Sequence, residues 1–316
     1  MTDAAFPLPR DATVYVAGHR GLVGSAIWRH LESSGHTGLL GRTSAELDLR
    51  DRAAVDAFFD AERPAYVVLA AAKVGGIVAN NTYPAEFLSD NLRIQLNVLD
   101  AARSFAVTRL LFLGSSCIYP KHAPQPIPES ALLTGPLEPT NDAYAIAKIA
   151  GVLHVQALRR EYGASFVSAM PTNLYGPGDN FDLESSHVLP ALIRRMHIAK
   201  ETGAPSVTLW GTGSPRREFL HVDDLARAVV HLMEHYDAPE PINVGVGDDI
   251  AIRDLAALVA DVVGYEGSVE WDTSRPDGTP RKLLDVSRIT ALGWKPEIAL
   301  RDGIAATYDW FRAHVA

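Results

Sequence analysis

Short apolar runs alternate with longer amphipathic stretches through the first half of this chain of 316 residues. Each run is bounded by glycine or polar residues, which is typical of a buried strand in a parallel sheet. The runs lie at residues 13–17, 38–41, 66–72, 109–114 and 166–170. The stretches between them carry apolar residues at helical spacing, so strands alternate with helices. This order predicts an α/β fold with a doubly wound, Rossmann-type parallel sheet.

Two long helices are expected to flank this sheet. Helical periodicity and helix-breaking residues place one of them over residues 84–105. Asn141 and Asp142 form a good N-cap for the other, which should extend to residue 161. The glycine-containing segment 73–81 is expected to be a flexible loop at the edge of the sheet where ligands bind.

Beyond residue 177 the alternation becomes less regular. We expect a polar loop, a basic helix, two short strands around a glycine turn, and a helix capped by Asp223 and Asp224. A last strand, an amphipathic helix, an extended loop rich in cations and a terminal helix complete the chain. In order, these elements are expected at residues 178–187, 188–200, 207–224, 223–235, 242–245, 255–263, 274–285 and 300–311.

This change of pattern predicts two domains. Residues 1–178 and 222–246 would form a Rossmann domain that binds a dinucleotide. Residues 179–221 and 247–316 would form a smaller C-terminal α/β domain that binds the substrate. A chain of this length, with 47% hydrophobic and 21% charged residues, can form one large domain or two coupled ones.

Charge and cysteine content narrow the class of protein. A formal net charge of -9 argues against a general nucleic-acid-binding surface, so an anionic ligand must be bound by locally placed arginines. The single cysteine, Cys117, excludes a disulfide within the chain and suits a reducing compartment. The N-terminus lacks the features of a signal peptide, and no apolar run is long enough to cross a bilayer. We therefore expect a cytoplasmic protein with no membrane partner.

Gly18, Gly21 and Gly24 follow the first predicted strand and begin a helix, which is the context that a dinucleotide-binding turn requires. Their spacing is G-x-x-G-x-x-G. Glycines allow the backbone to approach a pyrophosphate, and the helix N-terminus offers free N–H groups and the positive end of its dipole. An ordinary tight turn is the alternative, but the flanking strand and helix favour cofactor binding.

Arg42 lies at the end of the second predicted strand, where an acidic residue would bind a ribose 2′-hydroxyl. A cation at this position, together with Arg20 in the glycine turn, favours a 2′-phosphate and hence NADP(H). The alternative is that Arg42 is a solvated surface residue.

Ser115 and, two residues later, Cys117 follow the fourth predicted strand, at the sheet edge where α/β proteins bind ligands. Tyr144 and Lys148 have the i,i+4 spacing that places two side chains on one face of a helix. We expect the ammonium to stabilise the phenolate and so lower the pKa of Tyr144, which suits acid and base catalysis. Serine, tyrosine and lysine in this arrangement indicate hydride transfer at a carbonyl, although a Tyr–Lys pair at this spacing also arises by chance.

The glycine turn, Ser115, the Tyr144–Lys148 pair and the motifs at residues 171–177 and 217–224 together resemble the extended short-chain dehydrogenase/reductases. Longer runs are similar to the GDP-L-fucose synthases within that family. These runs lie at residues 18–27, 70–84, 114–120, 137–141 and 276–286. The resemblance covers nearly the whole chain. It implies the conversion of GDP-4-keto-6-deoxy-D-mannose to GDP-L-fucose, by epimerisation at C3 and C5 and reduction at C4 with NADPH.

The resemblance also implies catalytic roles. Tyr144 and Ser115 would hydrogen-bond O4 of the keto sugar, and Tyr144 would finally protonate it. Lys148 would hold the nicotinamide ribose. Cys117 would remove the protons at C3 and C5, both of which lie next to the ketone, and His187 would return a proton on the opposite face. Without the resemblance, Cys117 would be interpreted as a small buried hydrophobe and His187 as a loop residue.

A wider set of residues would bind the two ligands. The expected cofactor-binding residues are Gly18, His19, Arg20, Gly21, Leu22, Val23, Gly24, Arg42, Asp48, Leu49, Ala71, Leu113, Gly114, Ser116, Tyr144, Lys148, Pro171, Asn173, Leu174 and His187. The expected substrate-binding residues are Val188, Arg195, Trp210, Arg217, Asp277 and Lys282, with Arg281 as a further candidate for the diphosphate. No metal ion is expected.

Several alternatives stay open at this point. Fucose synthases commonly carry a second arginine two residues beyond the position of Arg42, and here that position is Ser44, which weakens the preference for NADP. The chain could instead be another nucleotide-sugar epimerase or reductase, or a protein that senses NADP(H) without turnover. A homodimer is expected from the resemblance and from the two long helices, which could pair into a four-helix contact.

Overall fold

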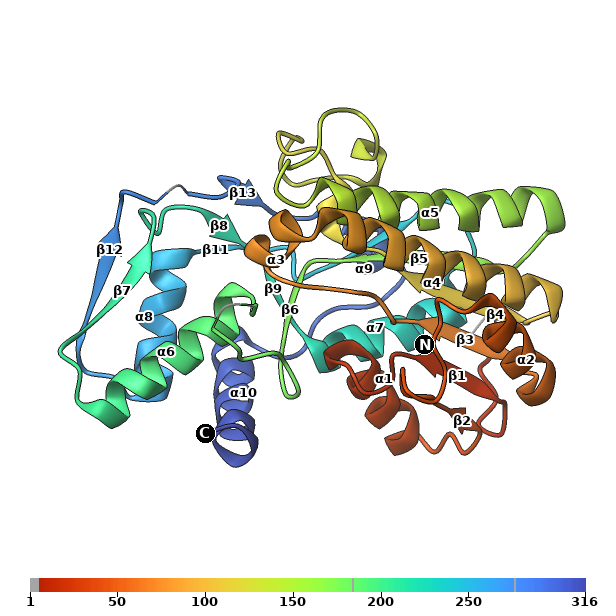
Figure 1. Cartoon of the computed structure of the whole chain (residues 1–316), viewed down its shortest axis with the longest axis horizontal. Helices are drawn as coiled ribbons and strands as arrows, with labels where there is room; N and C mark the ends of the chain where they lie inside the picture. Colours follow the sequence, from red (N-terminus) through yellow and green to blue (C-terminus); the bar gives the residue numbers. More distant parts are fainter. Residues whose placement is uncertain (1–5, 184, 276) are drawn as a thin grey trace.

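The computed structural model describes residues 6–183, 185–275 and 277–316, and it has a larger and a smaller part (Figure 1). The larger part is built on a six-stranded sheet in which neighbouring strands run parallel. The strand order is β10-β5-β4-β3-β1-β2. These strands are β1 (Val14–Ala17), β2 (Leu39–Leu40), β3 (Tyr66–Leu69), β4 (Arg109–Leu113), β5 (Phe166–Pro171) and β10 (Ile242–Val244). The predicted doubly wound, Rossmann-type sheet is confirmed.

Helices cover both faces of this sheet, and each face packs its own apolar core. One face carries α1 (Leu22–Ser33) and α7 (Val222–His235). The other carries α2 (Arg52–Glu62), α4 (Pro84–Ser104) and α5 (Asp142–Tyr162). The positions of the two long helices, α4 and α5, agree with the prediction to within one residue at their ends. Within the described residues, no helix combines the length and apolarity needed to cross a bilayer.

The smaller part has a separate core formed by three helices and two short sheets. Its helices are α6 (Val188–Thr202), α8 (Ile252–Val263) and α10 (Leu300–His314). One sheet pairs β7 (Ser206–Trp210) with β12 (Ser268–Asp272), and the other joins β8 (Arg216–Arg217) to β11 (Ile250–Ala251) and β13 (Arg281–Lys282). β6 (Asn173–Tyr175) and β9 (Phe219–His221) pair where the chain passes between the two parts.

The chain crosses back to the large sheet before it ends. α9 (Ser287–Ala291) packs against β10, and Ile289 and Trp294 join the core that α1 and α7 form. The two-domain division at the expected boundaries stays a prediction, and residues 1–5, 184 and 276 of those domains lie outside the described residues.

Local structure differs from the expectation in several places. Segment 73–81, expected to be a loop, contains most of α3 (Ile77–Thr82), and β10 is not the last strand because β11, β12 and β13 follow it. α7 is capped by His221, whose ring accepts a hydrogen bond from the backbone N–H of Asp223. Asp223 therefore lies in the first turn of the helix and not at its cap. Strands of two residues are too short to show a period, so only their pairing partners reveal them.

Candidate active site

The glycine turn between β1 and α1 leaves no room for a side chain at Gly18 or at Gly24. Gly18 has a left-handed φ of 84°, and a Cβ on it would lie 2.9 Å from the backbone of Ala71. A Cβ on Gly24 would lie 2.1 Å from the carbonyl oxygen of Gly18. Gly21 occupies the N-cap of α1, so no side chain covers the free N–H groups of the helix. This exposed helix N-terminus fits the pyrophosphate of a dinucleotide.

The two arginines expected at a 2′-phosphate differ in their availability. Arg42 forms an ion pair with Glu62, donates to the carbonyl oxygen of Gly41, and lies over the ring of Phe58. Arg20 is exposed and has no ion-pair partner among the residues that the structure describes. Arg20 is therefore the freer cation. Sequence reasoning missed the partner of Arg42 because Glu62 follows it by 20 residues, at the end of α2.

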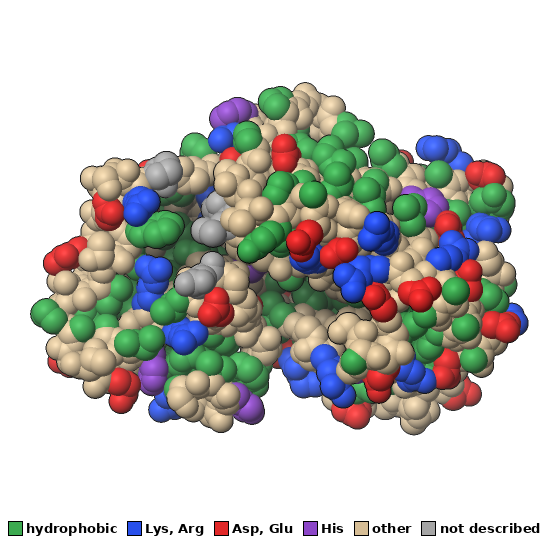
Figure 2. All heavy atoms as spheres, viewed as in Figure 1, with side chains coloured by type: hydrophobic (Ala, Val, Ile, Leu, Met, Phe, Trp, Pro, Cys, Tyr) green, Lys and Arg blue, Asp and Glu red, His purple; other side chains and the backbone are tan. Residues whose placement is uncertain are grey.

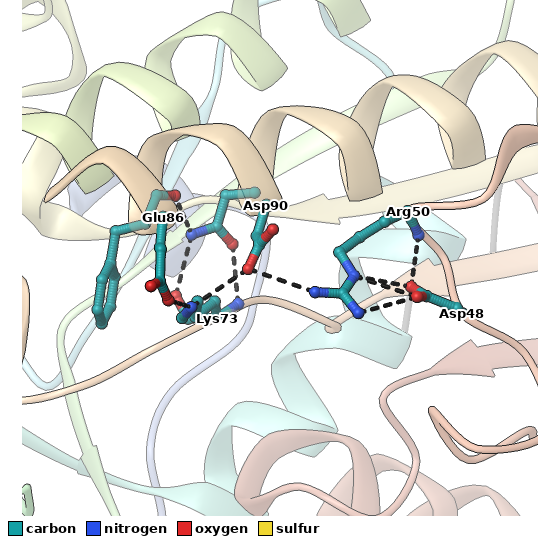
Figure 3. Close-up of polar contacts among 7 residues, drawn as sticks. Asp48, Arg50, Lys73, Glu86 and Asp90 are labelled. Atoms are coloured by element: carbon teal, nitrogen blue, oxygen red, sulfur yellow. Dashed lines mark hydrogen bonds and ion pairs between the residues drawn. The ribbon is translucent and has the colours of Figure 1, made fainter. Parts of the chain in front are cut away.

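A chain of charged residues joins two of the expected cofactor-binding segments (Figure 3). Asp48 pairs with Arg50 at 2.9 Å. Arg50 and Lys73 share the carboxylate of Asp90, at 3.6 and 3.2 Å respectively, and Lys73 also pairs with Glu86. Asp48 and Arg50 precede α2, Lys73 follows β3, and the two acidic partners lie in α4. The chain segments after β2 and β3 are thereby held together.

Asn91 extends this connection toward the expected catalytic tyrosine. Its side-chain oxygen accepts from the backbone N–H of Lys73 at 2.9 Å, and its side-chain nitrogen donates to the carbonyl oxygens of Lys73 and Phe87. The ring of Phe87 packs edge-on against the ring of Tyr144, with centroids 6.5 Å apart. The same turn of α4 therefore contacts both the loop after β3 and the phenol.

The expected serine, tyrosine and lysine lie together at the carboxyl end of β4. The Ser115 hydroxyl hydrogen-bonds to Tyr144. The Lys148 Nζ donates to the carbonyl oxygen of Leu113 at 2.8 Å and lies 5.9 Å from the centroid of the Tyr144 ring. The i,i+4 spacing thus places both α5 side chains against the end of β4, as expected.

The electrostatic effect on Tyr144 is the reverse of the expected one. Burial raises the pKa of Tyr144, the charge of Cys117 raises it further, and the hydrogen bond with Ser115 opposes these effects only in part. Burial also lowers the pKa of Lys148 to about 7. The expectation that Lys148 lowers the pKa of Tyr144 is therefore wrong in this structure. A desolvated amine that is only partly protonated at neutral pH is a weak source of positive potential.

Cys117 is half-buried in the short 3₁₀ turn η1 (Ser116–Ile118) that follows β4. Its backbone N–H donates to the Ser115 hydroxyl oxygen at 3.3 Å. Its Sγ accepts from Asn141 Nδ2 at 3.4 Å and from Lys282 Nζ at 3.8 Å. Asn141 occupies the N-cap of α5 as expected, but its side chain makes no capping bond and donates to the sulfur instead. The thiol therefore lies among polar groups of the site and not in the apolar core.

His187 occupies the N-cap of α6 and makes no side-chain capping bond. The backbone N–H of Gly76 donates to the carbonyl oxygen of Ser185 at 3.1 Å, so the segment before α6 contacts the loop after β3. The His187 side chain keeps an exposed surface, although surrounding protein atoms lower its pKa through desolvation. An imidazole that is neutral at pH 7 and reaches solvent can exchange protons.

Sequence reasoning missed Asp249, a carboxylate that organises the sheet of the smaller part. Its buried side chain pairs with Arg216 at 2.6 Å and with Arg281. These pairs join β11, β8 and β13. Lys282 is the register partner of Arg217 on this sheet, and both alternate with the paired arginines. Arg281, a candidate for the diphosphate, is therefore bound to Asp249 instead.

Three of the expected substrate-binding cations have no carboxylate partner within the described ranges of the chain. Arg195 is half-buried on α6. Arg217 donates to the backbone carbonyl of Arg216 at 2.8 Å, and burial lowers its pKa. Lys282 contacts the sulfur of Cys117. Cations that are not already paired suit an anionic diphosphate.

The other expected substrate-binding residues lie at the surface of the smaller part. Trp210 is 58% exposed, and the guanidinium of Arg275 lies 5.1 Å from the centroid of its ring. Asp277 accepts from the backbone N–H and the hydroxyl of Thr212, so it holds the turn after β7. Val188 begins α6 and is 38% exposed.

The remaining expected cofactor-binding residues lie mainly near the ends of the parallel strands. Asn173 donates to the backbone carbonyl of Glu218 at 2.9 Å, and Ser116 is buried in η1. The others are His19, Leu22, Val23, Leu49, Gly114, Pro171 and Leu174. Figure 2 shows a hollow between the larger and smaller parts on this face, with Lys and Arg side chains on both sides of it.

Comparisons with known proteins identify the family. The family model described as "NAD dependent epimerase/dehydratase family" matches residues 14–245. The chain is 61% identical over 313 residues to "Probable GDP-L-fucose synthase 1" of Oryza sativa subsp. japonica, covering 99% of this chain and 95% of that protein. It is 57% identical over 307 residues to "GDP-L-fucose synthase" of Escherichia coli (strain K12), covering 94% and 96%.

A solved structure supports the same assignment. The crystal structure of a GDP-L-fucose synthetase from Naegleria fowleri bound to NADP is 30% identical in sequence and has a TM-score of 0.90. The match covers 99% of this chain and 97% of that one. The chain belongs to the NAD-dependent epimerase/dehydratase family and, within it, to the GDP-L-fucose synthases.

Proposed function

We propose that this protein converts GDP-4-keto-6-deoxy-D-mannose to GDP-L-fucose, by epimerising C3 and C5 and then reducing C4. The protein uses a nicotinamide dinucleotide and acts on a nucleotide sugar. One observation carries the assignment of an epimerase as well as a reductase: the Cys117 thiol lies next to the Ser115–Tyr144 pair. Reduction of a ketone needs an acid but no thiol, whereas epimerisation next to a ketone needs a base.

Cys117 acts as this base. The protons at C3 and C5 are acidic because the carbanion left behind is an enolate, whose negative charge lies on O4. Tyr144 and Ser115 present hydroxyl groups to one point at the end of β4. Hydrogen-bond donors at this point stabilise the negative charge on O4, whether C3 or C5 has lost its proton. One site therefore serves both epimerisations.

The raised pKa of Tyr144 suits this mechanism better than the lowered one that the sequence suggested. A phenol that keeps its proton donates a hydrogen bond to O4 throughout and can finally transfer that proton to the alkoxide. The charge of Cys117 contributes to the shift, so a thiolate favours a protonated Tyr144. A deprotonated base at Cys117 is therefore compatible with a protonated acid at Tyr144.

His187 returns a proton on the face of the sugar opposite Cys117. Its lowered pKa means that it is largely neutral at pH 7 and takes up a proton from solvent before each transfer. Inversion at a carbon requires this second group, because a thiol that returned its own proton would restore the original configuration.

The cofactor is NADP(H). The glycine turn would hold its pyrophosphate, Lys148 would hold its nicotinamide ribose, and Arg20 would bind its 2′-phosphate, since Arg42 is already paired with Glu62. When bound, the dinucleotide supplies the hydride that reduces C4. Ser44 contributes no second charge in this chain, so the preference depends on Arg20 and is supported by the NADP named in the Naegleria fowleri structure.

The protein acts as a cytoplasmic homodimer. Leu96 on α4 and Ile146 and Leu153 on α5 are 43%, 46% and 42% exposed, and these two helices pack side by side. Ile146 and Leu153 are seven residues apart, so they share one face of α5. Burial of this apolar face against a second copy would form a four-helix contact.

Incubation with the keto sugar and NADPH in D2O tests the function. We expect NADPH oxidation and a GDP-L-fucose product with deuterium at both C3 and C5, detected by NMR. A product without deuterium would indicate a simple C4 reductase. NADP(H) binding without any turnover would indicate a sensing protein and would contradict the proposal.

A further inference from the structure

The sulfur of Cys117 lies within reach of two nitrogen donors from distant parts of the chain. Asn141 Nδ2 lies 3.4 Å from Sγ and comes from the N-cap of α5. Lys282 Nζ lies 3.8 Å from Sγ and comes from β13, 165 residues after the cysteine. An ammonium this close to a sulfur stabilises negative charge on it, and the amide N–H adds a second donor.

Two cations act on the sulfur: Lys282, which donates to Sγ directly, and Arg217, which interacts with Cys117 through its charge. Along β13, the preceding Arg281 is bound to Asp249. Successive side chains of a strand point to opposite faces, so this pair anchors the strand with Lys282 facing Cys117. Lys121, close to Cys117 in sequence, is neutralised by Glu138 at 3.0 Å. Lys282 has no carboxylate partner in the described part of the chain.

We propose that Lys282 is the counter-ion of the Cys117 thiolate and keeps it in the basic form before substrate binds. Lys282 is thus a positioning residue for the base. The two arginines of the site, Arg195 and Arg217, bind the diphosphate of the substrate. The inference rests on the proposed function only in taking Cys117 as the base. In the epimerisation step, a proton passes from C3 or C5 to Sγ, the C–H electron pair becomes the enolate, and the sulfur becomes neutral.

Alkylation of the free enzyme by iodoacetamide tests this without substrate or cofactor. The chain has one cysteine, so a single mass increase reports Cys117 alone. At pH 7, Lys282→Met should slow alkylation about threefold. Loss of the ammonium removes the positive charge that stabilises the reactive thiolate, so alkylation should slow. Methionine has a similar length, so access to the sulfur is preserved.

Two variants separate charge from shape. Lys282→Arg keeps the positive charge and should alkylate within twofold of the wild-type rate. Lys295→Met removes the same charge from an exposed position and should have no effect. Addition of 1 M KCl should slow the wild type toward the rate of Lys282→Met and leave that variant nearly unchanged, because salt screens the ion pair. The salt dependence of the wild type remains informative even if a variant fails to fold.

The competing role for Lys282 is binding of the diphosphate alone. In that case Lys282→Met would raise the KM for the nucleotide sugar, while alkylation of the free enzyme and its salt dependence would be unchanged, and the proposal would be overturned. Failure of the proposed function has a different signature. It would appear as absent turnover on the keto sugar, with the charge-dependent alkylation still present.

Discussion

Lys148 donates from its side-chain nitrogen to the backbone carbonyl of Leu113 at 2.8 Å, and burial lowers the pKa of the amine because it desolvates the charged form. The bond joins α5 to the end of β4 and fixes the lysine beside the Tyr144 ring. Rigid attachment to backbone suits a residue that orients a ribose. It also ties the stability of the fold to the protonation of this one group.

The lowered pKa of Lys148 predicts a pH dependence of stability. The folded value is about 7 and the reference value is 10.5, so between these pH values the unfolded chain binds more protons. The free energy of unfolding should therefore rise with pH in this window, by roughly 1–2 kcal/mol between pH 7 and 9. Lys148→Met should lose this increment, as measured by urea unfolding at both pH values. Equal gains in the two proteins would show that Lys148 is not buried as described.

Arg20 and Arg42 should contribute unequally to cofactor selection. Arg20→Ala should raise the KM for NADPH roughly 10- to 100-fold, the usual effect of losing a hydrogen bond to a charged group, and should leave the KM for NADH nearly unchanged. Arg42→Ala should have a smaller effect, because Glu62 already neutralises Arg42. Steady-state kinetics with both cofactors measure the difference. A larger effect at Arg42 would mean that its ion pair opens when the cofactor binds.

Cys117→Ser should retain cofactor binding and lose proton exchange. A serine hydroxyl is far less acidic than a thiol, so loss of the base should slow exchange by about 10² to 10⁴. Fluorescence titration with NADPH checks binding, and deuterium incorporation at C3 and C5 checks exchange. Undiminished exchange in this variant would assign the base to another residue.

His187→Gln should separate exchange from inversion. Cys117 can still remove and return a proton on its own face, so deuterium should enter the substrate without a change of configuration. NMR of the recovered keto sugar distinguishes the two results, because labelled but unepimerised sugar accumulates. Normal yields of inverted product would remove His187 from the mechanism.

The exposed face of α4 and α5 should control the oligomeric state. Replacement of both Ile146 and Leu153 by glutamate places two charges on each copy of the proposed contact, and burial of unpaired charge is costly. Light scattering at micromolar concentration should then show a monomer in place of a dimer. Ile198→Glu, an equally exposed apolar position on α6, serves as the control and should stay dimeric.

The sequence by itself was sufficient for the large sheet, the glycine turn and the spacing of Tyr144 and Lys148. Each of these depends on interactions between residues close in sequence. Buried strands need short apolar runs, and a tight turn needs glycine. Residues four apart in a helix lie on the same face. The prediction of a loop at residues 73–81 was wrong. The helical turn within this segment is stabilised by contacts with residues distant in sequence, such as Ser185.

Tertiary structure alone decided which charges are available at the site. It paired Arg42 with Glu62 and Arg281 with Asp249, and it placed Lys282 against Cys117. It also reversed the expected pKa shift of Tyr144. Ion pairs and desolvation depend on distances between groups that are far apart along the chain, and no local pattern of residues records those distances.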